Sequence, residues 1–466
     1  MSIAEGQLGT ATQGGSALNL KPFKIRSAPT TGGLIGLGAI LAGAALLCVA
    51  AATTNTLLPQ TIRPVLGTPL AGPLSHIHLY LGAGAVLIAV AAVFLGYVLA
   101  LRDAEQLPAK LVLGVICAFV LIVVLAPPMF STDLFSYQAY GRMFATLGAN
   151  PYVQGPQVLK LDGLYPFIGA QWVNTPTVYG PAFTLISGLF SDTASNGAIA
   201  FAAFAWKVIA ALSCLGVIAL MWRSARLRRV NPVPGVALFG LNPLIVLYGI
   251  GGGHNDLLMV LIAMAGIYAL LAERLRTSGV AIVAAAAVKL TGGIFLPFAL
   301  ASHGGDTRSR RKRILLGALS AGIVTLGVSL AVFGTGILNL PFTLDQVQAE
   351  GGWVTVSGLM TMLLPWHAVS HVISLLFGVG FLAIFLTLLR RVWQGSMDWL
   401  DGAAWATFWL LLASSQLMPW YLSWLLPLVA LASSRRLWRL SVWFSGWVLL
   451  STTLSYVPHG WSLIGL

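Results

Sequence analysis

Long apolar runs separated by short polar segments make up most of this sequence. The stretch LVLGVICAFVLIVVLAPPMF (111–130), for example, contains no charged residue. Apolar runs of about 20 residues span a bilayer as helices, and these runs lack the alternating polarity of membrane β-barrel strands. The pattern predicts helices near 32–53, 79–101, 109–126, 196–222, 234–250, 255–272, 314–334, 368–391, 400–417, 419–432 and 439–456.

Together with broken or partial crossings, these runs predict an all-α polytopic membrane protein. We expect about twelve or thirteen transmembrane helices in a single domain over residues 31–466. Composition supports this, because the chain is 58% hydrophobic and only 8% charged, whereas soluble domains carry about 25% charged residues. The composition therefore excludes an ordinary soluble protein.

The net charge of +13 comes from basic clusters in short loops. Lys and Arg gather in the cytoplasmic loops of membrane proteins, so the clusters indicate membrane topology and contact with membrane lipids rather than nucleic-acid binding. We expect residues 1–30 to be a flexible cytoplasmic tail and the protein to be a multi-pass plasma-membrane protein. The clusters lie at 223–230, 273–278, 308–313, 388–393 and 433–439.

The same charge argument places residues 127–195 on the outer side, as a large loop with short helices lying in the membrane interface. Within it, 179–190 is expected to dip into the membrane. The run 279–301 has basic clusters at both ends, so it should form a broken hairpin with Lys289 near its tip. A partial dip is also expected over 354–366.

Two general features narrow the function. The cysteines, Cys48, Cys117 and Cys214, lie in apolar runs and indicate neither a disulfide framework nor a metal set. No internal repeat is visible, which argues against a transporter built from inverted repeats.

The first candidate for chemistry is Asp133 in STDLFSYQAYGR (131–142), directly after a predicted span. Ionisable groups at membrane depth are costly and often functional. Asp133 could be only a helix N-cap. Ser131 or Thr132 could cap instead and would then leave the carboxylate free.

The second candidate is the segment YGIGGGHNDLLM (248–259), in which three glycines precede His254, Asn255 and Asp256. Glycine lets a ligand approach the backbone closely. Two potential ligands are a weak metal signal, so a hydrogen-bonding cluster for a phosphate or a sugar is the favoured interpretation.

Lys289 and an aromatic segment complete the candidates. An unpaired ammonium in lipid needs an anion, which at a hairpin tip would enter from the outer side; snorkelling to the interface is the alternative. In SSQLMPWYLSWLLP (414–427), Trp420, Tyr421 and Trp424 could be interfacial anchors. With Gln416 they could instead contact a sugar ring. A carboxylate, a cation and aromatic side chains on one side of the membrane suit a reaction of a lipid-phosphate sugar.

Five segments carry a resemblance to known enzymes. They are similar to the C-type glycosyltransferases, and in detail to actinobacterial polyprenol-phosphomannose-dependent α-1,6-mannosyltransferases, which extend the mannan of lipomannan and lipoarabinomannan. The resemblance covers roughly residues 110–430 in matching order. The segments are STDLFSYQAYGRMFATLGANPYVQGP, NTPTVYGPAF, LNPLIVLYGIGGGHNDLLM, AAVKLTGGIFLPF and QLMPWYLSWLLPL.

The resemblance implies a C-type glycosyltransferase fold and an inverting mannosyl transfer at the outer membrane face, with Asp133 as general base. The donor would be a polyprenyl-phosphate mannose and the acceptor a lipoglycan. Lys289 and His254, with Arg142 as a further candidate, would hold the donor phosphate. Contacts to sugar or acceptor would come from Tyr137, Tyr179, Asn255, Asp256, Gln416, Trp420 and Tyr421.

No cofactor, metal or nucleotide is expected. The candidate carboxylates are too few and too scattered for a magnesium site, and the chain has no G-x-x-x-x-G-K-[ST] loop to cradle a nucleotide phosphate. Two alternatives stay open: the same fold with another lipid-linked sugar, such as arabinofuranose or glucose, and a lipid or solute transporter such as a flippase.

Overall fold

The structure, a computed structural model, describes residues 30–53, 57, 83–194, 199–349, 352, 354–363 and 367–456. Every regular element in these residues is a helix, and no strand occurs among them, so the all-α prediction is confirmed. The predicted cytoplasmic tail, residues 1–30, lies outside the described residues except for its last residue, and the predicted dip at 354–366 is described only in part.

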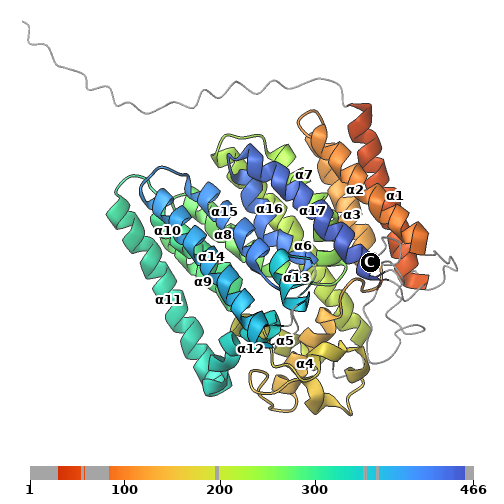
Figure 1. Cartoon of the computed structure of the whole chain (residues 1–466), viewed down its shortest axis with the longest axis vertical. Helices are drawn as coiled ribbons and strands as arrows, with labels where there is room; N and C mark the ends of the chain where they lie inside the picture. The colour runs from red at the N-terminus through yellow and green to blue at the C-terminus, as the bar shows by residue number, and fades with distance from the viewer. Residues whose placement is uncertain are drawn as a thin grey trace, which may run out of the picture.

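The helices follow the apolar runs closely (Figure 1). The α-helices are α1 (Thr31–Thr53), α2 (Ala83–Arg102), α3 (Ala109–Leu125), α4 (Asp133–Ala145), α5 (Pro181–Ala194), α6 (Ile199–Leu227), α7 (Pro232–Gly240), α8 (Asp256–Leu271), α9 (Leu275–Val288), α10 (Phe295–Ala301), α11 (Thr307–Phe333), α12 (Leu340–Ala349), α13 (Val356–Leu363), α14 (His367–Trp393), α15 (Trp399–Ala413), α16 (Leu422–Leu431) and α17 (Arg435–Tyr456). Short 3-10 helices cover Pro156–Leu159, Tyr165–Phe167, Ala170–Trp172, η7 (Leu290–Ile294), η8 (Gly334–Asn339) and η9 (Pro419–Tyr421), and η6 (Leu244–Ile250) is a π-helix.

The protein is a multi-pass membrane protein, but fewer of its helices than expected are full-length spans. Five described helices are long and apolar enough to cross a bilayer, and the pair α7 and η6, bent by 45°, makes a sixth. Other predicted spans, including α3 and α8, form shorter apolar helices of 10–17 residues. They are short because proline, glycine or polar residues interrupt the runs, and such breaks are tolerated at membrane depth where protein surrounds them.

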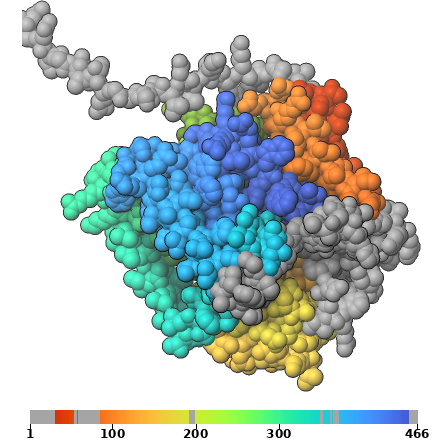
Figure 2. Space-filling model, in the orientation of Figure 1, coloured from red at the N-terminus to blue at the C-terminus, as the bar shows by residue number. Residues whose placement is uncertain are grey.

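The helices differ in how much of their surface the protein covers. The most apolar stretches of α11 and α14 are only 22% and 11% buried, so these helices present apolar side chains outward, as lipid contact requires. In Figure 1, α4, α5 and α12 gather at one end of the helices, and the space-filling view shows the residues of α4 forming that end of the surface (Figure 2). Of the predicted outer loop, 181–194 forms α5, which packs on α4.

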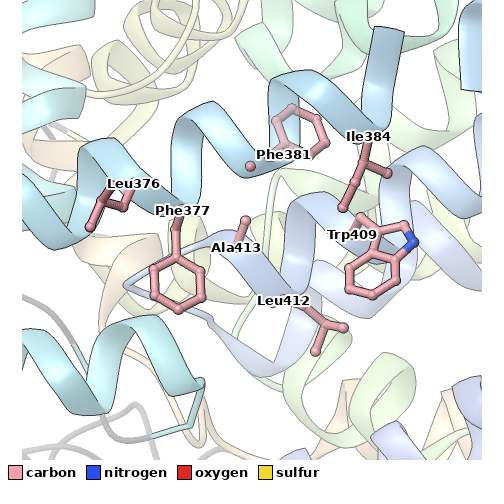
Figure 3. Close-up of a pocket in the computed structure, with 8 residues that line it drawn as sticks. Leu376, Phe377, Phe381, Ile384, Trp409, Leu412 and Ala413 are labelled. Atoms are coloured by element: carbon pink, nitrogen blue, oxygen red, sulfur yellow. The ribbon is translucent and has the colours of Figure 1, made fainter. Parts of the chain in front are cut away.

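Apolar grooves lie on the surface formed by the described helices. One, of about 320 Å³, lies between α14 and α15, where the rings of Phe377, Phe381 and Trp409 surround it (Figure 3). Another, of about 310 Å³, lies between α2 and α17. Their apolar walls fit surfaces that lipid chains cover.

The predicted broken hairpin is confirmed. Helix α9 ends at Val288, Lys289 is extended at φ −151° and ψ 127°, and the chain returns as η7 and α10. Arg310, after the return, pairs with Glu273, which lies just before α9. The two basic loops therefore lie side by side, and Lys289 is at the far tip.

Candidate functional site

Asp133 opens α4 but does not cap it. The N-cap position belongs to Thr132, whose side chain makes no capping hydrogen bond, and the backbone N–H of Asp133 donates to Ser131 Oγ at 3.1 Å. The carboxylate therefore lies in the first helical turn, where the positive end of the helix dipole stabilises a negative charge. Its side chain is 13% exposed, which leaves it accessible to a small group such as a hydroxyl.

A glycine turn brings His254 to this carboxylate. Nδ1 of His254 lies 3.4 Å from Oδ2 of Asp133. Gly253 has φ +65°, and a Cβ on Gly252 would lie 2.6 Å from Nε2 of the histidine, so both positions need glycine. The imidazole stacks on Trp420, with ring centroids 3.4 Å apart and planes at 17°. His254 is therefore held on one side by an indole and faces Asp133 on its edge.

Tyr137, one turn after Asp133, ties α4 to the same segment. Its hydroxyl donates to Oδ1 of Asn255 at 3.4 Å, accepts from the Asn255 backbone N–H at 3.3 Å and lies 3.5 Å from His254 Nδ1. Burial, and then the charges of Asp133 and Asp256, raise the pKa of Tyr137 well above its usual range. The phenol therefore stays neutral and acts as a hydrogen-bonding support.

An aromatic cluster encloses Tyr137. Its ring meets the neighbouring rings edge-on, with centroids 4.8 to 5.5 Å away. These rings belong to Tyr179, Phe183 and Trp206. Tyr179 therefore supports Tyr137 from the segment just before α5.

Lys289 does not lie alone, which corrects the prediction of an unpaired cation. Its ammonium donates to Oδ1 of Asp256 at 2.8 Å and lies 4.5 Å from the centre of the Tyr421 ring. The indole N–H of Trp424 donates to the same carboxylate oxygen at 2.7 Å. The hairpin tip meets the N-terminus of α8, so the anion that Lys289 requires already comes from the chain.

The Asp133–His254 pair and the Lys289–Asp256 pair belong to one site, because residues of η9 contact both. Trp420 stacks on His254, and the next residue, Tyr421, lies against Lys289 and stacks on Trp424 with centroids 4.2 Å apart. Asp133 is also close enough to interact electrostatically with Lys289. Three polar atoms at this place are buried and have no hydrogen-bond partner in the described residues: His254 Nε2, Asn255 Nδ2 and Asp256 Oδ2.

The contacts described for two predicted site residues are with other parts of the chain. Arg142 lies nine residues after Asp133, about 13 Å along α4, and its guanidinium pairs with Asp162 at 2.5 Å. Gln416 follows α15, and its backbone N–H donates to the Gln348 side chain at 3.3 Å. The described residues also contain no group of three His, Cys, Asp or Glu side chains that could hold a metal ion.

Comparison with known proteins now decides the family. A family model described as "Alpha-(1->6)-mannopyranosyltransferase, N-terminal domain" matches residues 32–303, more than half of the chain. The chain belongs to this family. The match includes the segments that carry Asp133, His254 and Lys289, while Trp420 and Tyr421 lie beyond it.

Individual members of the alpha-(1->6)-mannopyranosyltransferase family are similar over most of the chain. Alpha-(1->6)-mannopyranosyltransferase A of Mycobacterium tuberculosis is 30% identical over 70% of this chain and 66% of its own length. Alpha-(1->6)-mannopyranosyltransferase B of Corynebacterium glutamicum is 27% identical over 74% and 62%. The chain thus spans slightly less than two thirds of these two relatives. No solved structure matches the chain significantly.

The family assignment confirms the resemblance seen in the sequence, but sequence reasoning missed one buried cation. Lys207, in the N-terminal third of α6, is fully buried, and its ammonium donates to backbone carbonyls at the end of α3. The signal was available, because a single lysine inside the run 196–222 needs a partner for the same reason as Lys289.

Proposed function

We propose that this protein transfers a mannosyl group from a polyprenyl-phosphate mannose to a mannan acceptor on a lipoglycan, with inversion and formation of an α-1,6 linkage. Membership of the alpha-(1->6)-mannopyranosyltransferase family supports the sugar and the linkage. The observation that carries the chemistry is the Asp133 carboxylate, which is accessible and faces His254, in a site that Trp420 and Tyr421 join to the buried cation Lys289.

Asp133 acts as the general base. The acceptor hydroxyl oxygen forms a bond to the anomeric carbon while its proton passes to the carboxylate, and the bond from that carbon to the phosphate oxygen breaks. Direct attack from the opposite face inverts a β-linked donor to an α-linked product. One carboxylate suffices, because the departing polyprenyl phosphate is stable as an anion and needs charge stabilisation rather than a proton.

Lys289 supplies that stabilisation. An ammonium has three donor hydrogens; Asp256 engages one and the Tyr421 side chain also interacts with the ammonium, which leaves donor capacity for a phosphate. Because Asp256 and the Tyr421 ring hold the ammonium before the donor arrives, little reorganisation is needed, and such preorganised donors stabilise developing charge by about 3–4 kcal/mol each. The unpartnered Nε2 of His254 and Nδ2 of Asn255 can bond the same phosphate or the sugar.

The reaction is assigned to the outer face of the plasma membrane. The basic loops contain 273–278 and 308–313, which face the cytoplasm by the positive-inside rule. Lys289 is at the hairpin tip, away from those loops. Residues 127–195, with α4, then belong to the outer side, where a lipoglycan acceptor and a lipid-linked donor are both accessible.

The test uses the purified full chain with radiolabelled polyprenol phosphomannose and a mannan oligosaccharide. We expect an extended product with an α-1,6 linkage, and loss of the product with Asp133→Asn. Asp345→Asn, an exposed carboxylate on α12, is the matched control and should transfer at the wild-type rate.

Other outcomes overturn parts of the proposal. Transfer only from arabinofuranosyl or glucosyl polyprenyl phosphate would keep the mechanism and replace the sugar. Movement of the donor across a proteoliposome membrane without any new glycosidic bond would make the protein a transporter. Equal rates for Asp133→Asn and the wild type would show that Asp133 is not the general base.

A further inference from the structure

Lys207 is a buried cation whose partners are backbone carbonyls. Lys207 lies in the N-terminal third of α6 and is 0% exposed. The ammonium donates to the carbonyl oxygens of Val123 at 2.8 Å and Pro127 at 3.2 Å, and also to that of Ala126. All three oxygens belong to the last turn of α3 or to the residues that directly follow it.

The sequence of α3 explains why these oxygens need a donor. In a continuing helix the carbonyl of Val123 would accept from the N–H of residue 127, but Pro127 has no N–H. The last carbonyls of a helix have no partner within the helix and carry its negative dipole end. At a buried position without water, one ammonium satisfies several of them and is itself stabilised.

The segment fixed by Lys207 leads directly to Asp133. After Pro127, the N–H of Met129 donates to the carbonyl of Gly251 at 3.1 Å, in the glycine turn that carries His254. Phe130 then adopts φ +64°, and its ring stacks on Tyr248 at 4.2 Å between centroids. A non-glycine residue in this conformation persists only where the surroundings hold it. The contacts of Met129 with Gly251 and of Phe130 with Tyr248 thus hold the segment that leads into α4.

We propose that Lys207 is a positioning residue for the reaction. Its ammonium fixes the end of α3, and through residues 127–132 it fixes where the Asp133 carboxylate lies relative to His254. The predicted effect of Lys207 on catalysis rests on the proposed function, whereas its predicted effect on the structure of residues 127–132 does not. A misplacement of about 1 Å can lower a rate about a hundredfold, so loss of this anchor should be measurable in turnover.

The first experiment compares kinetic constants of the purified full chain. Lys207→Met removes the ammonium and keeps most of the stem. We expect kcat to fall by about ten- to a hundredfold, with the donor KM changed less than about twofold, because Lys289 still binds the phosphate. Lys207→Arg, which keeps the charge and the donors, should restore part of the rate. Met221→Ala, a cavity variant farther along α6, is destabilised in the same helix and should keep the wild-type kcat.

A second experiment separates positioning from a merely structural role. In the Asp133→Asn background, Lys207→Met should lower the residual rate little further, because both changes act on the same step. The same factor of loss in both backgrounds would overturn the proposal. An unchanged kcat in folded Lys207→Met would do so as well.

The third measurement does not depend on activity. Amide hydrogen exchange over 126–133 should be faster in Lys207→Met than in the wild type, and unchanged in Met221→Ala. If Lys207→Met does not fold, Lys207→Gln takes its place, because its shorter amide reaches fewer carbonyls. Unchanged exchange in the folded variant would overturn the anchor. A wild type that transfers no sugar, with faster exchange in the variant, would refute the proposed function and leave the anchor standing.

Discussion

Removal of the Lys289 ammonium should destabilise the protein, because it leaves the carboxylate of Asp256 buried without its cation. The Lys289 and Asp256 side chains are only 11% and 1% exposed. Breaking a buried ion pair by removing one partner costs about 3–5 kcal/mol. The hydrogen bond from Trp424 to Asp256 remains and offsets a small part of this loss.

We therefore expect Lys289→Met to lose about 3–5 kcal/mol of folding stability. The loss arises from the unpaired charge on Asp256, so removing that charge as well should restore most of the stability.

The assay is the thermal unfolding midpoint in detergent at pH 7.5. Lys289→Met should unfold several degrees below the wild type. The double variant Lys289→Met/Asp256→Asn lacks both charges of this pair and should recover most of the midpoint. It should not recover mannosyl transfer, because the phosphate still lacks its cation.

One result would refute this reasoning. If Lys289→Met keeps the wild-type midpoint, the ammonium is not paired with Asp256 in the folded protein. The cation would then be free at the hairpin tip, and the sequence-based expectation of a lone lysine would be correct after all.

Three further predictions follow from the site. Asp133→Asn should fold normally and lose at least about a hundredfold in rate, the lower range for a general base; a wild-type rate in a radiolabel transfer assay would contradict this. Arg142→Gln should lower the thermal midpoint, because Asp162 loses its ion-pair partner, while the donor KM changes little. A large rise in that KM would show that Arg142 does bind the donor phosphate. In a background lacking the native cysteines, an impermeant maleimide should label Lys160→Cys but not Gly305→Cys in intact cells, and the reverse pattern would place the site on the cytoplasmic side.

The sequence by itself determined the helical architecture and its main interruptions. Each apolar run is stable in lipid as a helix independently of the other runs. The bounds of α1, α3, α8 and α14 could therefore be predicted to within a few residues. The broken hairpin also followed from local information, since charge at both ends and a lysine in the middle permit few other paths. Family membership rested on short motifs and was confirmed.

Only the tertiary structure decided which side chains meet. Lys289 and Asp256 lie 33 residues apart, and Trp424 and Asp256 168 residues apart, so their contacts depend on how separate helices pack and on their rotation about their own axes. A lone lysine in an apolar run marks Lys207 as needing a partner, but its partners are backbone carbonyls, which every residue possesses, so only the structure could identify them. The sequence therefore specified where polar groups interrupt the membrane helices, whereas packing alone determined that their charges are paired in advance around Asp133 and His254.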